Sequence, residues 1–246
     1  TSSRPTRRTT TTTDDMRIFY DPDNIESLGR PVVTVGSFDG VHAGHGILLD
    51  TVKRLAAELH EQSVVITFEP HPRIALGTDS GLSLLTTVGE KAMLLERAGI
   101  DNLVVAPFDK QFAGQTYAEF IERFMVGKLH IGGLVVGYNH RFGRDNEGNY
   151  DTLAPLAERY GFAVRRVDQY RDDDDKVSST VIRALVAEGH MKRAARMLAH
   201  PYAVAGTAVD GRITVDNPYK LLPPAGRYDV AIGGRRTTAS VDGRVI

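Results

Sequence analysis

The chain reads Val32-Val33-Thr34-Val35-Gly36-Ser37-Phe38-Asp39-Gly40-Val41-His42-Ala43-Gly44-His45 at the point where its architecture is set. The stretch begins as an apolar, β-branched run, which is typical of a buried parallel strand. It continues into a glycine-rich turn, and beyond the turn apolar residues recur at helical spacing, so we expect a helix to begin near Gly44. A strand, a glycine turn and a helix in this order present backbone N–H groups to a phosphate.

Two histidines stand at the predicted start of this helix. His42 and His45 are three positions apart, so they share a face at the helix N-terminus, where the dipole is positive. We interpret the pair as part of a polyphosphate site. The alternatives are capping or surface histidines, and a zinc site, which the absence of a nearby cysteine or carboxylate triad disfavours.

Composition limits the classes of protein that fit. The 246 residues suffice for one large α/β domain and a small module. A net charge of −1 argues against a general nucleic-acid binder, and the absence of cysteine fits a reducing cytoplasm. We find no apolar run of membrane-spanning length and no signal-peptide core behind the N-terminal arginines. The expectation is a cytoplasmic protein with no nucleic-acid or membrane partner, and the oligomeric state stays open.

Apolar runs alternate with helical patterns along most of the chain. The expected strands are 32–36, 64–68, 103–106, 134–137 and 162–167, and the expected helices are 45–60, 89–98, 117–129, 151–160, 180–188 and 190–199. Because helices separate successive strands, we predict a Rossmann-like α/β fold: a doubly wound parallel sheet of about five strands with helices on both faces. Residues 17–20 are an edge-strand or docking candidate. Ligands of such sheets bind beyond the carboxyl ends of the strands.

Three further motifs follow predicted strands or open a predicted helix. Phe68-Glu69-Pro70-His71-Pro72 is a stiff loop after the second strand, and Gly137-Tyr138-Asn139-His140-Arg141-Phe142-Gly143 follows the fourth. Ser178-Ser179-Thr180 opens a helix, with Arg183 one turn inside it. Hydroxyls at a helix start cap it and donate to phosphate, and an arginine can fork onto phosphate oxygens. Taken singly, the motifs also fit plain turns and N-caps.

Together these motifs resemble the bacterial FAD synthetases, the FMN adenylyltransferases of the H-x-G-H nucleotidyltransferase superfamily. The resemblance covers residues of about 30 to 200 in four ordered motifs. It implies catalytic roles for His42, His45, Asn139 and Arg183. It implies ATP binding by Gly36, Phe38, Asp39, Gly40, His42, His45, Ser178, Ser179, Thr180 and Arg183. It implies flavin binding by Phe68, Pro70, His71, Pro72, Asn139 and Phe142. The chain departs from the family pattern at His140, where the family usually has Phe.

Other segments read as structural. Residues 84–101 resemble a family segment that we interpret mostly as core packing. The aromatic group is also expected mainly to pack in the core, with Phe108 or Phe112 as a lesser candidate for the flavin pocket; it comprises Phe108, Phe112, Tyr117, Phe120 and Phe124. The acidic run 172–175 is expected to be a solvated loop, because adjacent aspartates do not preorganise a metal site. No direct metal ligand is predicted.

The sequence divides the chain into three regions. Residues 1–15 are threonine-rich and are expected to be a disordered tail, or upstream sequence before a natural start at Met16. Residues 16–200 form the predicted nucleotidyltransferase domain, and 201–246 a small all-β module. Residues 221–230 are similar to the middle of a riboflavin kinase barrel, but the family's Pro-Thr-Ala-Asn element and room for its catalytic Glu are missing. The resemblance therefore implies a truncated remnant that is inactive as a kinase.

The resulting hypothesis is an enzyme that makes FAD and pyrophosphate from ATP and FMN, with Mg²⁺ accompanying ATP. An FMN phosphate oxygen would attack the α-phosphorus in line, so that catalysis consists of positioning and charge stabilisation. One alternative is an H-x-G-H nucleotidyltransferase for another phosphate substrate. The other is a non-catalytic flavin or nucleotide sensor.

Overall fold

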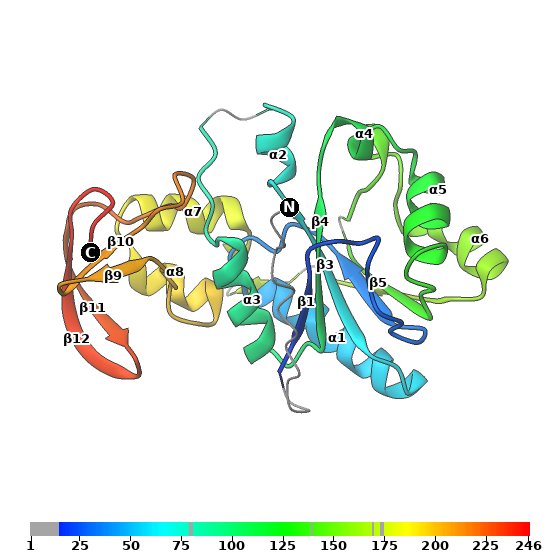
Figure 1. The fold of residues 1–246 in the computed structure, drawn as a ribbon, viewed down its shortest axis with the longest axis horizontal. Coiled ribbons are helices and arrows are strands. Elements are labelled where there is room, and N and C mark those ends of the chain that lie inside the picture. Colours follow the sequence, from blue (N-terminus) through cyan, green and yellow to red (C-terminus); the bar gives the residue numbers. More distant parts are fainter. Residues whose placement is uncertain (1–14, 79–80, 139, 169, 173–174) are drawn as a thin grey trace, which may run out of the picture.

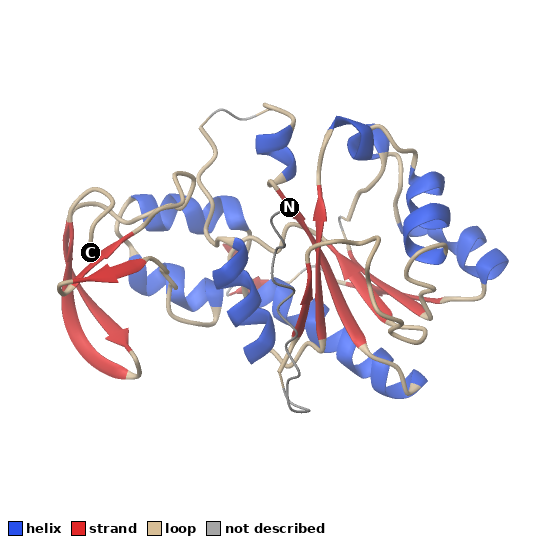
Figure 2. Ribbon diagram, viewed as in Figure 1, coloured by secondary structure: helices blue, strands red, loops and turns tan. Residues whose placement is uncertain are grey.

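Six parallel strands form one sheet in the order β1-β4-β3-β2-β5-β6 (Figures 1 and 2). The computed structural model describes residues 15–78, 81–138, 140–168, 170–172 and 175–246. The strands are β1 (Arg17–Phe19), β2 (Val32–Val35), β3 (Ser63–Glu69), β4 (Asn102–Pro107), β5 (Gly133–Gly137) and β6 (Ala163–Val167). The Rossmann-like prediction is confirmed, and the edge-strand candidate is the sixth strand. The direction of the crossovers reverses between β2 and β5, which makes this the switch point where ligands bind.

Helices cover both faces of the sheet (Figure 1). They are α1 (Ala43–Leu59), α2 (Pro72–Ala75), α3 (Val88–Arg97), α4 (Lys110–Ala113), α5 (Tyr117–Glu119), α6 (Tyr150–Tyr160), α7 (Ser179–Ala187) and α8 (Met191–Leu198), with a π-helix η1 (Phe120–Val126) and a 3₁₀ turn η2 (Arg144–Asn146). The short α2 and α4 were not predicted, because one helical turn is too short to show a hydrophobic period.

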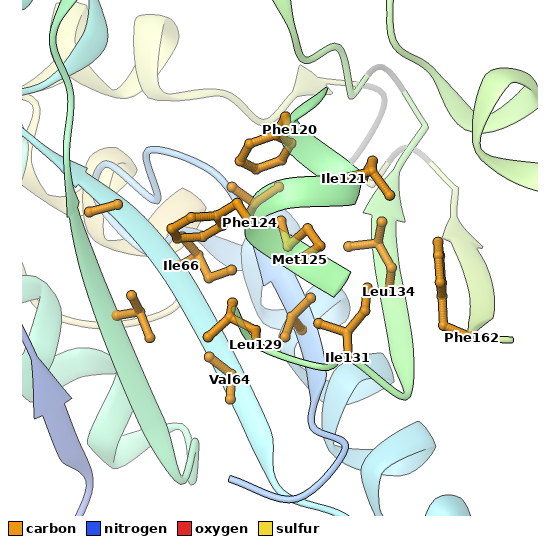
Figure 3. Close-up of a cluster of buried hydrophobic side chains, with 14 of the residues drawn as sticks. Val64, Ile66, Phe120, Ile121, Phe124, Met125, Leu129, Ile131, Leu134 and Phe162 are labelled. Carbon is orange, nitrogen blue, oxygen red and sulfur yellow. The ribbon is translucent and has the colours of Figure 1, made fainter. Parts of the chain in front are cut away.

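Alternate strand residues supply the two halves of the core, as the pleat requires. Val33 and Ile66 point to the face covered by η1 and α6, whereas Val32 and Val65 point to the face covered by α1 and α3. Figure 3 shows the half of the core that contains Val33 and Ile66. In it, η1 lies over the sheet and Ile121 packs into this half of the core. Because both faces are buried, the strands read as continuous apolar runs in the sequence.

The predicted helix over 117–129 is instead split into α5 and the π-helix η1. The backbone N–H of Gly127 donates to the carbonyl of Glu122, five residues back, at 2.9 Å. The wider turn stacks the rings of Phe120 and Phe124, with centroids 5.7 Å apart, against the sheet. The helical period of 3.6 residues used for the prediction cannot show such a local change of register.

Three short antiparallel pairs of strands come after β6 in the described chain, the first before α7 and the other two after α8. The pairs are β7 (Arg171–Asp172) with β8 (Asp175–Lys176), β9 (Thr207–Val209) with β10 (Arg212–Thr214), and β11 (Gly226–Ile232) with β12 (Arg235–Val241). The first pair contains the ends of the acidic run, which was predicted as a loop. The tail residues 1–14 lie outside the described residues.

The residues after 200 dock on the loop before α3 through a buried lysine. Lys220 is 2% exposed, and its Nζ lies 3.0 Å from Oε2 of Glu90. It also donates to the carbonyls of Leu85 at 2.5 Å and Ala203 at 2.6 Å. A buried ammonium group needs such partners to offset its lost hydration. The contact fixes the β-module against residues 84–90.

Truncation of the π-helix core tests this packing. We expect Ile121→Ala to lower the free energy of unfolding by about 3 kcal/mol, because Ile121 is 0% exposed and the deletion leaves a cavity. The control is Leu59→Ala on α1, where the side chain is 40% exposed and the expected loss is within about 1 kcal/mol. Urea unfolding followed by circular dichroism measures both. Equal losses for the two variants would contradict the described core.

Candidate functional site

The turn between β2 and α1 is a tight one that depends on left-handed backbone conformations. Phe38, Gly40 and Val41 all have positive φ, at 47°, 85° and 42°. A Cβ on Gly40 would meet Leu85 at 2.8 Å, so glycine is required there on two grounds. The turn places His42 at the N-cap of α1, where its Nδ1 accepts a hydrogen bond from the backbone N–H of His45 at 3.3 Å.

The two histidine rings stack on each other at the helix start. Their centroids are 3.7 Å apart and their planes are inclined by 14°. Burial lowers the pKa of His42 to about 4, and burial together with the nearby His42 and Lys91 lowers the pKa of His45 well below its usual value. Both imidazoles are therefore neutral at pH 7, in agreement with their close stacking. In the described part of the chain, the buried Nδ1 of His45 has no hydrogen-bond partner.

Asp39 joins three segments of the site. Its carboxylate accepts hydrogen bonds from the backbone N–H of Leu85 at 3.1 Å and of Thr86 at 2.9 Å, and from the Thr86 hydroxyl at 3.3 Å. Arg183 adds an ion pair through Nη2 at 2.8 Å, and the Asp39 side chain is only 3% exposed. These bonds occupy both carboxylate oxygens. Asp39 thus acts as an anchor for its neighbours.

Helix α7 meets the same turn from the other side. The Ser178 hydroxyl caps α7 by accepting from the Val181 N–H at 3.4 Å, and the Ser179 hydroxyl donates to the carbonyl of Asp39 at 2.8 Å. Thr180 is exposed. Arg183 is 16% exposed in its side chain, and its buried Nε has no hydrogen-bond partner among the residues described. The N-termini of α1 and α7, which both favour anions, are therefore connected by residues predicted to bind ATP.

A cavity of about 540 Å³ adjoins this turn. Gly36 and Ser37 lie in its wall, at the carboxyl end of β2. Much of the remaining wall is aromatic, from Phe68, Phe108, Phe112, Phe120, His140 and Phe142. Its size suits a small molecule with a flat apolar ring.

The structure places only some of the predicted flavin-binding residues in the wall of the cavity. Phe68, Pro72 and Phe142 line the cavity, whereas Pro70 and His71 are not among its lining residues. Burial lowers the pKa of His71 to about 4, and the charges of Asp39, Lys91 and Arg183 are near enough to act on it. Asn139 lies outside the described residues.

Several residues of the site were missed or underrated by the sequence reasoning. Phe108, Phe112 and Phe120 all line the cavity, although the aromatic group was assigned mainly to the core. Thr86, which binds both Asp39 and the Gly40 N–H, was treated as part of a packing segment. Lys91 belongs to the same segment, and it is a buried cation, 5% exposed, beside the site. The polar neighbours of Lys91 come from distant parts of the chain, so the sequence pattern could not predict them.

Among the residues that the structure describes, no group of three or more metal-ligating side chains is found. Asp39, the carboxylate nearest the turn, is fully engaged by its hydrogen bonds. A dedicated protein site for a divalent cation does not fit this donor set.

Neutralising Asp39 tests its role as an anchor. We expect Asp39→Asn to lower the free energy of unfolding by about 3 kcal/mol, because it leaves the buried guanidinium of Arg183 without its counter-charge. Asp50→Asn is the matched control: Asp50 pairs with Lys53 at 2.9 Å but is 66% exposed, so about 0–1 kcal/mol is expected. Urea denaturation measures both changes. An Asp39→Asn protein as stable as the parent would refute the anchor.

The sequence and the fold are similar to those of known proteins. The FAD synthetase family model matches residues 24–181. The chain is 33% identical to an FAD synthetase of Listeria monocytogenes, covering 82% of this chain and 81% of the relative. It is 32% identical to a bifunctional riboflavin kinase/FMN adenylyltransferase of the same organism, covering 81% of this chain and 67% of the relative.

Other relatives are longer than the matched region. A bifunctional riboflavin kinase/FMN adenylyltransferase of Escherichia coli K12 is 33% identical over 73% of this chain, which spans only 58% of that relative. A solved structure described as a macrolide-efflux protein from Streptococcus pneumoniae has a TM-score of 0.78 and 27% identity, covering 93% of this chain and 79% of the other. Within the described residues, none of the helices has the length and apolar character to cross a membrane.

The matched segment contains the strand–turn–helix unit with its two histidines, the aromatic cavity wall and the start of α7. On this match and on the identity to relatives, the chain belongs to the FAD synthetase family.

Proposed function

We propose that this chain is an FMN adenylyltransferase, which makes FAD and pyrophosphate from ATP and FMN. One observation carries the proposal: Gly36 and Ser37, which begin the turn between β2 and α1, also line the aromatic cavity. A flavin ring in the cavity would direct its ribityl phosphate toward the N-termini of α1 and α7. Membership of the FAD synthetase family supports the choice of flavin for the cavity.

The reaction needs no nucleophile from the protein. A phosphate oxygen of FMN forms a bond to the α-phosphorus of ATP, and the bond from that phosphorus to the α–β bridging oxygen breaks, leaving its electron pair on pyrophosphate. The protein contributes positioning and preorganised donors. His42 and His45 would hold phosphate oxygens at the start of α1, while Ser178, Ser179 and Arg183 would hold them from α7.

The neutral state of the two histidines suits this role. A neutral imidazole can donate one hydrogen bond, and the buried Nδ1 of His45 has no hydrogen-bond partner among the described residues. The positive charge needed by the triphosphate then comes from Arg183 and the helix dipoles. Mg²⁺ would enter with ATP and would help to neutralise the charge of the pyrophosphate that leaves.

We also propose a division of the chain into two functional parts. Residues 16–200 would form the adenylyltransferase unit, and 201–246 a β-module without riboflavin kinase activity. The buried contact between Lys220 and Glu90 supports a structural role for the module. A cytoplasmic location without a nucleic-acid partner is also proposed, in line with the net charge of −1 and the absence of cysteine.

The test is incubation of the purified chain with ATP, magnesium and either FMN or riboflavin, followed by chromatography of the flavins. We expect FAD from FMN and no product from riboflavin. His45→Ala should lower kcat by about 10² to 10³-fold, the usual effect of losing one donor to developing charge. His60→Asn, which changes the exposed histidine at the other end of α1 and suits its left-handed backbone, should keep parental activity.

Three results would contradict the proposal in distinct ways. Pyrophosphate release with another phosphate substrate but not with FMN would indicate a different nucleotidyltransferase. Binding of FMN and ATP without turnover would indicate a sensor. A product from riboflavin would show that the β-module retains kinase activity.

A further inference from the structure

Lys91 is a buried cation whose role the fold does not explain. It lies in α3 and is 5% exposed. Its Nζ donates to the Thr67 hydroxyl at 2.7 Å, and that hydroxyl donates to the Ser37 carbonyl at 3.2 Å. The ammonium group therefore lies at the carboxyl end of β3, directly beneath the phosphate-binding turn. An ammonium group has three N–H donors, and within the described chain one of them has a protein acceptor.

No carboxylate among the described residues lies within ion-pair distance of this ammonium. Asp39 and Glu69 are near enough to favour its charge, yet burial prevails and lowers the pKa of Lys91 to about 8. Buried cations in proteins are normally paired, since an isolated one loses its hydration without compensation. The contrast within the same helix is clear: neighbouring Glu90 has the buried Lys220 as its partner at 3.0 Å. Burial of the Lys91 ammonium group is therefore unfavourable in free energy unless an anion pairs with it.

The surroundings indicate where this anion would bind. Lys91 is close enough to His45 and to His71 for its charge to depress the pKa of both. Two further polar atoms of the site, Nδ1 of His45 and Nε of Arg183, are buried without partners in the described chain. Polar groups of α1, α3 and α7 near the turn thus keep hydrogen-bonding capacity that the described residues do not use.

A purely structural role would be to hold the Ser37 carbonyl through Thr67. That role needs only a hydroxyl and a neutral neighbour, because Thr67 itself makes the bond to Ser37. It does not require a positive charge at a position that is 5% exposed. The charge is the feature to be explained.

We propose that Lys91 is a catalytic residue of the adenylyl transfer, and that its ammonium group contacts the ATP phosphates and stabilises the negative charge that develops on the departing pyrophosphate. The inference rests on the proposed function and adds to it a residue on α3. Lys91 stays protonated throughout, and the electron pair of the broken bond remains on pyrophosphate. Such a preorganised charge acts strongly because the Lys91 side chain is buried.

The decisive comparison is between Lys91→Met and Thr67→Val. The first removes the charge and keeps a side chain of similar length, whereas the second removes the hydrogen bonds to Lys91 and Ser37 and keeps the charge. We expect Lys91→Met to lower kcat by about 10² to 10³-fold and Thr67→Val by less than about tenfold. Lys91→Arg should recover part of the loss. Melting temperatures establish that each variant is folded.

Lys53→Met is the matched lysine control. Lys53 donates to the carbonyl of Ala98 at 2.7 Å, just after α3 ends, so it fixes the opposite end of the same helix. Its replacement should leave kcat within about twofold. Equal losses for Lys91→Met and Thr67→Val, or a kcat of Lys91→Met within threefold of the parent, would overturn the proposal.

A titration with inorganic pyrophosphate separates this inference from the proposed function. We expect Lys91→Met to bind pyrophosphate at least tenfold more weakly than the parent and than Lys53→Met. If the parent makes no FAD but Lys91→Met still shows this weaker binding, the flavin assignment fails and the phosphate role of Lys91 stands. If pyrophosphate affinity is unchanged in Lys91→Met, the role of Lys91 fails whatever the substrate.

Discussion

The buried carboxylate of Asp39 is the constraint on which the site depends. It accepts hydrogen bonds from the loop before α3 and an ion pair from α7, while its own backbone belongs to the turn that starts α1. Three segments distant in sequence are thereby fixed around one charge. The geometry leaves the N-termini of α1 and α7 on either side of the turn, with Arg183 held between them. Removal of the carboxylate would therefore disturb the whole site.

The β-module contributes to the same arrangement from the outside. Lys220 donates to the carbonyl of Leu85, and the N–H of Leu85 donates to Asp39. The peptide groups flanking Leu85 thus connect the module to the anchor of the site. Glu90 strengthens this connection, because it bonds to Lys220, to the Ala205 N–H at 2.6 Å and to the start of α3. This chain of contacts gives residues after 200 a structural role that requires no catalysis of their own.

Sequence periodicity was sufficient for the sheet and its main helices. Continuous apolar strands such as 32–35 and the capped helix α3 are specified by local pattern, so their bounds agree within a few residues. The histidine pair and Arg183 were found because motif spacing places them at helix starts. The π-helix η1, the burial of Lys91 and the pairing of Lys220 with Glu90 were not predictable. Each depends on contacts between segments far apart in the chain, and a lysine in a helical pattern is ordinarily a solvated residue.

In the proposed enzyme, the turn between β2 and α1 serves both a nucleotide and a flavin. A crystal structure of the chain with FMN and a non-hydrolysable ATP analogue would show whether it does. We expect the triphosphate between the starts of α1 and α7, and the isoalloxazine ring in the aromatic cavity beside Phe68 and Phe142. A flavin bound elsewhere, or a triphosphate that contacts neither His45 nor Arg183, would contradict it.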